Sequence, residues 1–200
     1  METATAMPHL TRNDLLPLEQ YATERQAMRQ RVMAHKQARR VDLGANVSLY
    51  FEDQLTMQYQ IQEMLRIERI FEAEGIQEEL DAYNPLIPDG SNWKATMMIQ
   101  IEDIEERRAA LASMLGIEHK VWMRVGDLDP VTPIADEDLE RDTEEKTSSV
   151  HFLRFELTPE MVAAAKGGAP ISAGVEHPAY NADTGPLPEA TRASLVADLA

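Results

Sequence analysis

The sequence predicts a single α+β domain with an antiparallel or mixed sheet of about five or six strands packed with helices. The length of 200 residues suits one large domain. Segments with the alternating apolar pattern of strands are interspersed with segments that have the 3.6-residue periodicity of helices. Turns rich in proline and glycine separate these segments, and neither a long linker nor an internal repeat interrupts them. This mixture is typical of an α+β domain rather than of a repeated βα unit.

Helices are expected in the first part of the chain. Thr11 and Asp14 have the spacing of a capping box, with Asp in place of the usual Glu. A long helix is then expected from Pro17, a residue suited to a first helical turn, to about Arg39. Arg25 and Arg39 lie beside its narrow apolar stripe. They either extend past the edge of that stripe into solvent or pair with a buried acid.

The sequence is organised around a long central helix expected over 53–73, after a short strand at 46–51. On a helical wheel, Glu68 falls in the middle of the apolar stripe of this helix. A buried carboxylate needs an ionic partner, hydrogen bonds or a proton, because an unpaired buried charge is very costly. We therefore expect Glu68 either to pair with Arg25 or Arg39 or to ligate a metal.

A turn-rich loop is expected at 84–92, after a short helix at 76–83. Its two prolines and an Asp-Gly pair predict tight turns. Such a loop is either a rigid connector or a binding loop, because its polar side chains are held on a stiff frame. Asn84, Asp89 and Asn92 are accordingly the candidate ligand-binding residues.

The second half of the chain is expected to alternate strands with helices. The expected strands are 93–101, 119–125, 131–135, 148–157 and 171–175. The expected helices are 102–115 and 158–167, with a short acidic helical turn at 136–138. Residues 1–180 form the expected domain, and residues 181–200 are expected to be a peripheral C-terminal tail with a short helix.

The strand at 148–157 brings the polar candidates of this half together. Its two-residue period places His151 on one face and both Arg154 and Glu156 on the other, where they could pair with each other. His151 is either a hydrogen-bonded core histidine or a ligand. The candidate catalytic residues are Glu68, His151 and Arg154. The candidate metal ligands are Glu63, Glu68, His151 and Glu156.

Composition excludes several classes of chemistry. The chain has no cysteine, so it cannot itself hold an iron–sulfur cluster or a thiolate zinc site, and the identity of any cofactor stays open. The sequence also lacks HExxH, P-loop, GxGxxG and GxSxG motifs. These absences leave a site assembled from distant segments as the remaining route to catalysis.

Charge and hydropathy give expectations about partners and location. The net charge is −16, with +3 in residues 1–40 and −19 in residues 41–200, so nucleic-acid binding is not expected except through the first helix. Apolar runs are too short to span a membrane, and the N-terminal residues lack the pattern of a secretory signal. A cytoplasmic protein that binds neither nucleic acid nor membrane is expected.

Five segments together resemble one bacterial protein family. They are FEDQLTMQYQIQEMLRIE (51–68), YNPLIPDGSNWKATMM (83–98), IADEDLER (134–141), KTSSVHFLRFEL (146–157) and GVEHPAY (174–180). The resemblance covers about residues 8–180, and the family, of about the same length, is catalogued as a domain of unknown function. The resemblance implies no catalytic residues. It does imply a genomic setting, since such proteins are often encoded beside rubrerythrin and an iron–sulfur protein similar to a heterodisulfide reductase subunit.

Two hypotheses about function follow. The first is an accessory or interaction protein of that redox system, in peroxide defence or electron transfer, whose acidic surface meets a basic face of rubrerythrin or of the iron–sulfur oxidoreductase. The second is a metal- or small-ligand-dependent enzyme with a site built from Glu68, His151 and Arg154, because polar groups inside apolar stripes tend to be functional.

Overall fold

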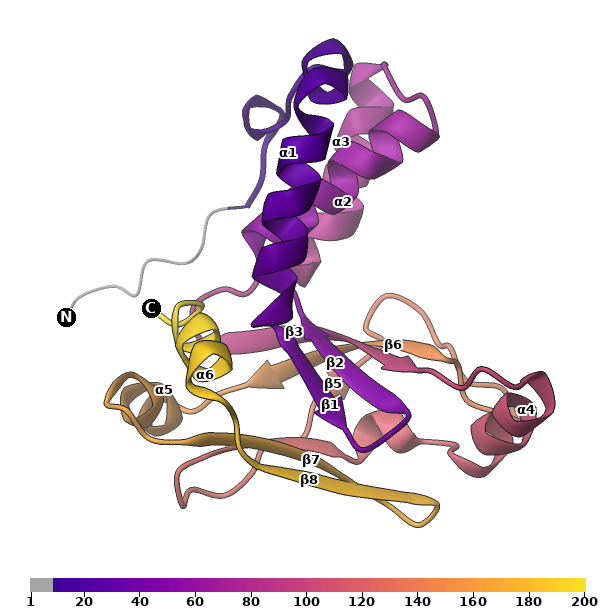
Figure 1. Cartoon of the computed structure of the whole chain (residues 1–200), viewed down its shortest axis with the longest axis vertical. Coiled ribbons are helices and arrows are strands. Elements are labelled where there is room, and N and C mark those ends of the chain that lie inside the picture. The colour runs from indigo at the N-terminus through magenta and orange to yellow at the C-terminus, as the bar shows by residue number, and fades with distance from the viewer. Residues whose placement is uncertain (1–8) are drawn as a thin grey trace.

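A three-helix arm rises from a body of two stacked antiparallel sheets in the computed structural model, which describes residues 9–200 (Figure 1). The arm consists of α1 (Leu18–Gln37), α2 (Gln54–Ile67) and α3 (Ala73–Tyr83). The first sheet has the order β1 (Arg40–Leu43), β2 (Val47–Phe51), β3 (Asn92–Ile99), β6 (Val150–Glu156) and β5 (Ile134–Ala135). The second has the order β4 (Val121–Val125), β7 (Ile171–His177) and β8 (Tyr180–Pro186).

Shorter helices complete the body and the arm. These are α4 (Ile104–Ser113), α5 (Pro159–Lys166), α6 (Glu189–Val196) and the 3-10 helices η1 (Arg12–Asp14), η2 (Asn84–Leu86) and η3 (Ile117–His119). The α+β prediction is confirmed, but the strands form two sheets of five and three strands rather than one of five or six. Among the described residues, no helix combines the length and the apolar character needed to cross a membrane.

The main core lies between the two sheets. Phe51, Trp93 and Phe155 from the first sheet and Met123 and Val175 from the second are all fully buried in one cluster. Burying a side chain of this size contributes about 1.5–3 kcal/mol. The alternating burial along β6 follows directly from the two-residue period of a strand, and it confirms the predicted division of β6 into two faces.

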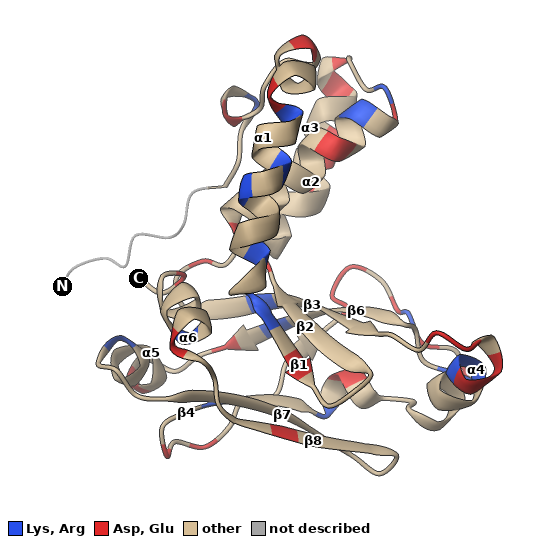
Figure 2. Cartoon of the chain, viewed as in Figure 1, with Lys and Arg blue, Asp and Glu red and all other residues tan. Residues whose placement is uncertain are grey.

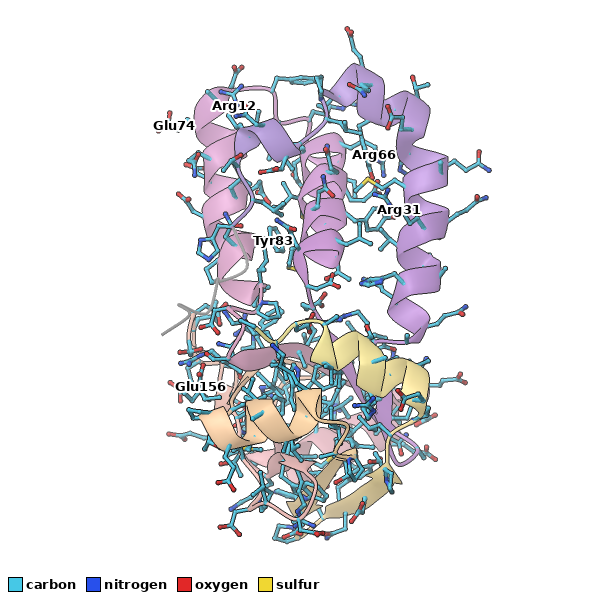
Figure 3. The ribbon with its side chains drawn as sticks, turned by 90° about the vertical axis from the view of Figure 1, so that its left-hand side faces the viewer. Arg12, Arg31, Arg66, Glu74, Tyr83 and Glu156 are labelled. Carbon is cyan, nitrogen blue, oxygen red and sulfur yellow. The ribbon has the colours of Figure 1, made fainter. Side chains whose placement is uncertain are left out.

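The arm has its own smaller cores. Met57, Ile61 and Leu65 of α2 pack with Leu80 of α3, and Tyr21 of α1 is buried against the other side of α2. The predicted capping box is present at η1, where both the backbone N–H and the hydroxyl of one residue reach the carboxylate three residues later. In the side view, Glu74 lies near the tip of the arm, Tyr83 toward its base and Glu156 in the body below (Figure 3).

The predicted helix over 53–73 is wrong in its second half, because α2 ends at Ile67. The chain then adopts a left-handed conformation at Arg69, with φ of 55°, and the N–H of Ile70 donates to the carbonyl of Leu65 at 2.9 Å. This is the Schellman ending of a helix, accompanied by the usual apolar contact between the same two residues. Since the left-handed residue is arginine rather than glycine, the local sequence carried no signal for this helix end.

The expectation of a peripheral tail at 181–200 also differs from the structure. Strand β8 pairs with β7, and Leu195 of α6 is fully buried in the main core. The indole N–H of Trp93 donates to the carbonyl of Leu195 at 2.9 Å. Because β8 is an edge strand that is only partly covered, its residues are polar and turn-like, and its sequence gave no strand pattern.

The remaining elements agree with the prediction within a few residues, with three exceptions. Strand β1 was not expected, because residues 40–43 follow α1 almost directly. The strand expected at 131–135 reduces to β5 and an isolated bridge between Met123 and Val131. Residues 136–138 do not form a helical turn, because Asp136 has a left-handed φ of 51° and its carboxylate serves another purpose.

Candidate metal centre

Strand β6 places the imidazole of His151 in the interior of the body, where it is fully buried. Its Nδ1 lies 2.5 Å from Oδ2 of Asp136, the residue that follows β5. The other oxygen of Asp136 accepts a hydrogen bond from the backbone N–H of Phe152 at 2.9 Å, and Arg141 lies 3.1 Å from the same oxygen. Asp136 is therefore held at three points and fixes the orientation of the imidazole ring.

The second ring nitrogen, Nε2 of His151, faces mainly acceptor atoms. The carbonyl oxygen of Ser148 lies 3.1 Å away, Oδ1 of Asp142 3.8 Å and Oε2 of Glu118 3.9 Å. The hydroxyl of Thr147 is nearest, at 2.8 Å, but it donates its one proton to Oδ1 of Asp142 at 2.7 Å. A positive charge, either a second proton on the ring or a metal ion, is needed to satisfy this group of acceptors.

Glu118 is the anomalous member of this cluster. It lies on η3, on the side of the second sheet, and is only 5% exposed. Its Oε1 lies 3.1 Å from Nε2 of His119, whereas its Oε2 is buried and has no hydrogen-bond partner. A buried carboxylate oxygen without a partner is costly and uncommon in folded proteins. This oxygen points toward Nε2 of His151, where a cation would satisfy both groups.

Glu118, Asp142 and His151 together have the geometry of a metal site. Each offers one ligand atom, and these atoms all lie within 4.8 Å of one another. A metal-bound histidine almost always directs its other ring nitrogen to a carboxylate or carbonyl, as His151 does to Asp136. Two carboxylates also balance the charge of a divalent ion. One imidazole with two carboxylates suits Mn²⁺, Fe²⁺ or Zn²⁺ better than the soft ions that require thiolates.

A pocket of about 370 Å³ adjoins the cluster. Its lining residues are Gly116, Glu118, His119, Ala135, Asp136, Glu140, Arg141 and Asp142. The guanidinium of Arg141 is paired with Asp138 at 2.6 Å as well as with Asp136, and it lies over the ring of Phe152. Pairing with Arg141 lowers the pKa of Asp138 to about 2.

Of the residues predicted for the site, His151 is the one that the structure places in this cluster. The expectation that Glu68 is buried is wrong: it is the exposed C-cap of α2 on the arm, whereas His151 lies in the body. The largely buried acid of α2 is Glu63, which accepts hydrogen bonds from Arg25 at 2.7 and 2.9 Å and from the hydroxyl of Tyr21 at 2.6 Å. The guanidinium of Arg25 lowers the pKa of Glu63 to about 2, so this carboxylate is already paired.

The expectation that Arg39 pairs with a buried acid also finds a partner other than Glu68. Its guanidinium is fully buried and lies 2.6 Å from Oδ2 of Asp198, the residue that follows α6 by one position, and 3.5 Å from Asp53. Burial raises the pKa of Asp198 to about 6, despite the neighbouring guanidinium. This ion pair joins the end of the first helix to the C-terminal segment.

Arg154 and Glu156 pair with each other on the face of β6 opposite to His151, as their spacing suggested. Arg154 also binds Glu137 at 2.8 and 2.6 Å. These pairs leave Arg154 and Glu156 outside the cluster around His151. Sequence reasoning therefore grouped residues that the strand separates.

The three candidates in the 84–92 loop are engaged within the protein. Asn84 makes two hydrogen bonds with the backbone of Leu10, at 2.8 and 2.9 Å. Asp89 accepts from the N–H and hydroxyl of Ser91, and Asn92 donates to Glu156 at 2.9 Å. These contacts favour the rigid-connector interpretation of the loop, and ligand binding there stays an untested prediction.

Three acids of the cluster were not predicted. Asp136 and Asp142 belong to a strongly acidic stretch that has the pattern of a solvated helix start, and Glu118 sits in a short 3-10 turn. Their approach to His151 depends on how η3, the 136–149 segment and β6 pack, and no spacing in the sequence encodes it. The one available signal was that several acids flank a histidine on a buried strand face.

The fold and this cluster define an α+β protein with a buried histidine–carboxylate centre at the edge of its two sheets. The chain belongs to the DUF3501 family, described as a protein of unknown function, whose profile matches residues 9–199. It is similar to the crystal structure of a novel protein of unknown function from Burkholderia pseudomallei K96243. The two are 55% identical with a TM-score of 0.91, over 96% of this chain and 100% of that one. No curated protein matches the chain.

Proposed function

We propose that this protein binds one divalent transition-metal ion through Glu118, Asp142 and His151, with Asp136 orienting the histidine. The observation that carries the proposal is the buried, unpartnered Oε2 of Glu118, which lies 3.9 Å from Nε2 of His151. The proposal keeps the metal-dependent alternative drawn from the sequence but replaces Glu68 and Arg154 as its residues.

Charge supports this assignment over a purely structural histidine. A hydrogen-bonded core histidine needs partners for its two nitrogens, and Asp136 and Ser148 already supply them. Glu118 and Asp142 would then be two further carboxylates beside the ring without a matching charge. A divalent ion balances both, and the donor set is the one that Mn²⁺, Fe²⁺ and Zn²⁺ accept.

Metal analysis of protein purified without chelator tests the proposal. We expect about one Mn, Fe or Zn per chain by inductively coupled plasma mass spectrometry, or saturable binding of one added Mn²⁺ by equilibrium dialysis. Glu118→Gln and Asp142→Asn should weaken Mn²⁺ binding by more than about 10-fold. The control Glu144→Gln changes an exposed acid in the same segment and should leave binding unchanged. Equal binding by all four proteins, or none by the wild type, would refute the metal centre.

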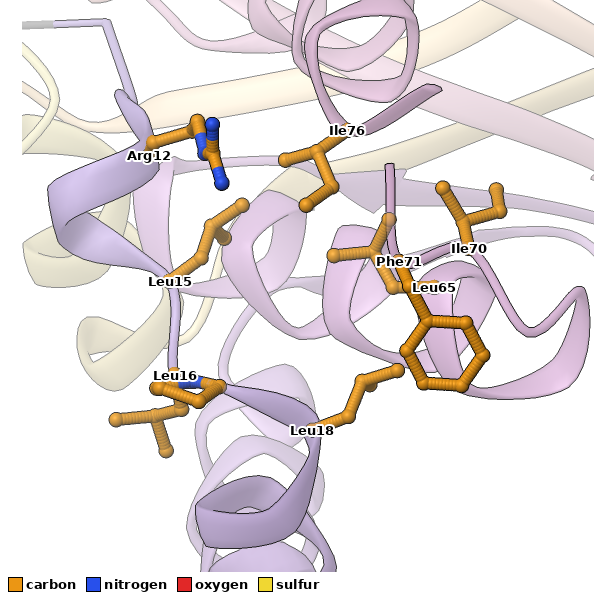
Figure 4. A pocket seen from close by; sticks show the side chains of 9 residues that line it. Arg12, Leu15, Leu16, Leu18, Leu65, Ile70, Phe71 and Ile76 are labelled. Carbon is orange, nitrogen blue, oxygen red and sulfur yellow. The ribbon is translucent and has the colours of Figure 1, made fainter. Parts of the chain in front are cut away.

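A second function, compatible with the first, is suggested by the tip of the arm. Ile67 and Phe71 are 53% and 67% exposed there. They adjoin a pocket of about 280 Å³ in which Phe71 lies beside Leu18 (Figure 4). Grouped exposed apolar side chains commonly mark protein interaction sites. Charged residues of both signs surround this tip (Figure 2).

The genomic setting implied by the family resemblance suggests the partner. On this proposal the protein is a cytoplasmic accessory of a rubrerythrin or of the neighbouring iron–sulfur oxidoreductase. Purified rubrerythrin from the same genome should bind the wild type in sedimentation velocity but not Phe71→Ser. Met33→Ser, which alters an apolar residue that is 40% exposed elsewhere on the arm, is the control. If neither redox protein binds the wild type, the accessory role is refuted.

A further inference from the structure

We infer that the metal centre is open on one side, and that its metal keeps exchangeable oxygen ligands which face the 370 Å³ pocket. The inference rests on the proposed metal site and concerns what that site binds. It distinguishes a centre that can take a substrate from one that only stabilises the fold, because structural metal sites are closed whereas catalytic ones keep a free position.

The placement of the ligands defines the open side. His151 is fully buried and does not line the pocket, so it forms the inner wall together with Thr147 and the carbonyl of Ser148. Glu118 and Asp142 do line the pocket, and they flank the region in front of Nε2 of His151. A metal bound to these three residues therefore has protein on the histidine side and the pocket on the opposite side.

The number of available donors leaves positions free. Each of the three residues offers one ligand atom. The second oxygen of Glu118 is directed to His119, and the second oxygen of Asp142 accepts from the backbone N–H of Gly116 at 3.3 Å. Zinc takes at least four ligands and Mn²⁺ about six. At least one ligand of the metal must therefore come from solvent or from a molecule in the pocket.

The charges around the pocket indicate which molecules fit. The two carboxylates cancel the charge of a divalent ion, and Arg141 is already paired with Asp136 and Asp138. Among the residues that line this pocket, Glu140 is an exposed acid with no cation assigned to it in the described contacts. An anion such as phosphate would meet this acid and find no free guanidinium. The ligand class that fits is a small neutral molecule that presents a hydroxyl or carbonyl oxygen, with water in its absence.

Water-proton relaxation on the Mn²⁺-loaded full-length protein tests the inference. An inner-sphere water that exchanges with bulk should raise the relaxation rate per Mn²⁺ several-fold above that of free Mn²⁺, because the bound ion tumbles with the protein. Adding 1,2-propanediol, a neutral diol, should lower this enhancement at a lower concentration than inorganic phosphate does.

The outcomes separate this inference from the metal site itself. If dialysis shows no bound Mn²⁺, the metal site fails. If one Mn²⁺ is bound but the relaxation rate stays at or below that of free Mn²⁺, the site is closed and the inference is overturned while the metal site stands. If phosphate lowers the enhancement more effectively than the diol, the neutral ligand class is wrong.

Discussion

Replacing Glu118 with glutamine should change stability in opposite directions with and without metal. In the metal-free protein the substitution removes a buried charge whose second oxygen has no partner and leaves a neutral side chain of the same shape. In the presence of metal it removes a ligand. We therefore expect Glu118→Gln to be more stable than the wild type in chelator and less stable in saturating Mn²⁺.

The sizes of the two effects follow from the environment of Glu118. An unsatisfied buried polar group costs about 1–3 kcal/mol. Because Oε1 of Glu118 retains its contact with His119, which is 62% exposed on its side chain, we expect a gain near the lower limit, about 1 kcal/mol. For a chain of this length, 1 kcal/mol corresponds to a rise in Tm of about 2–4 °C. Metal at about 100 times its Kd should stabilise the wild type by about 2.7 kcal/mol, so the order of the two Tm values reverses.

Thermal unfolding followed by circular dichroism, with EDTA and with Mn²⁺, measures both effects. Glu144→Gln is the matched control, since it removes an exposed acid from the segment that carries Asp142. It should behave like the wild type in both conditions. The reasoning is refuted if Glu118→Gln is the less stable protein in EDTA, which would mean that the carboxylate has a structural partner, or if Mn²⁺ stabilises it as much as the wild type.

Three further substitutions test other parts of the structure. Glu63→Gln should lower the free energy of unfolding at pH 7 by about 1–2 kcal/mol. Since the folded-state pKa of Glu63 is lowered to about 2, this loss should shrink as the pH falls from about 4.5 toward 2. Urea titrations should show no such loss for the exposed control Glu78→Gln. The pKa of Asp198 is raised to about 6 by burial, so its contribution to stability falls as the pH rises from about 4 to 6, and Asp198→Asn should remove that part of the pH dependence of urea unfolding. Gly174→Ala would place its Cβ 2.2 Å from the ring of Trp122, so we expect a loss of about 1–3 kcal/mol in the same assay, and an unchanged midpoint would contradict the packing of the second sheet.

Much of the local structure could be predicted from the sequence. The two faces of β6 follow from the alternation of its residues, and the pairing of Arg154 with Glu156 follows from their spacing on one face. The capping box at Thr11 and Asp14 was also predictable, because its hydrogen bonds join residues three positions apart. In each case the interacting groups are close neighbours along the chain.

The candidate site was predictable only in His151. Its partners come from η3, the end of β5 and an irregular segment, and the nearest of the three acids is nine residues away in the chain. The acidic stretch at 136–142 has the composition of a solvated loop, and local rules favour that interpretation. Only the packing of the two sheets turns Glu118 and Asp142 toward the imidazole.

What the sequence by itself determined was the class of fold, most element positions, the absence of thiolate chemistry and the inward direction of His151. The tertiary structure decided which acids are buried. A helical wheel shows that Glu68 shares a face with apolar residues, but α2 ends before that face meets a neighbour, whereas Glu63 meets α1. Burial and ion pairing depend on what lies opposite a side chain, and periodicity along one segment cannot specify the element that packs against it.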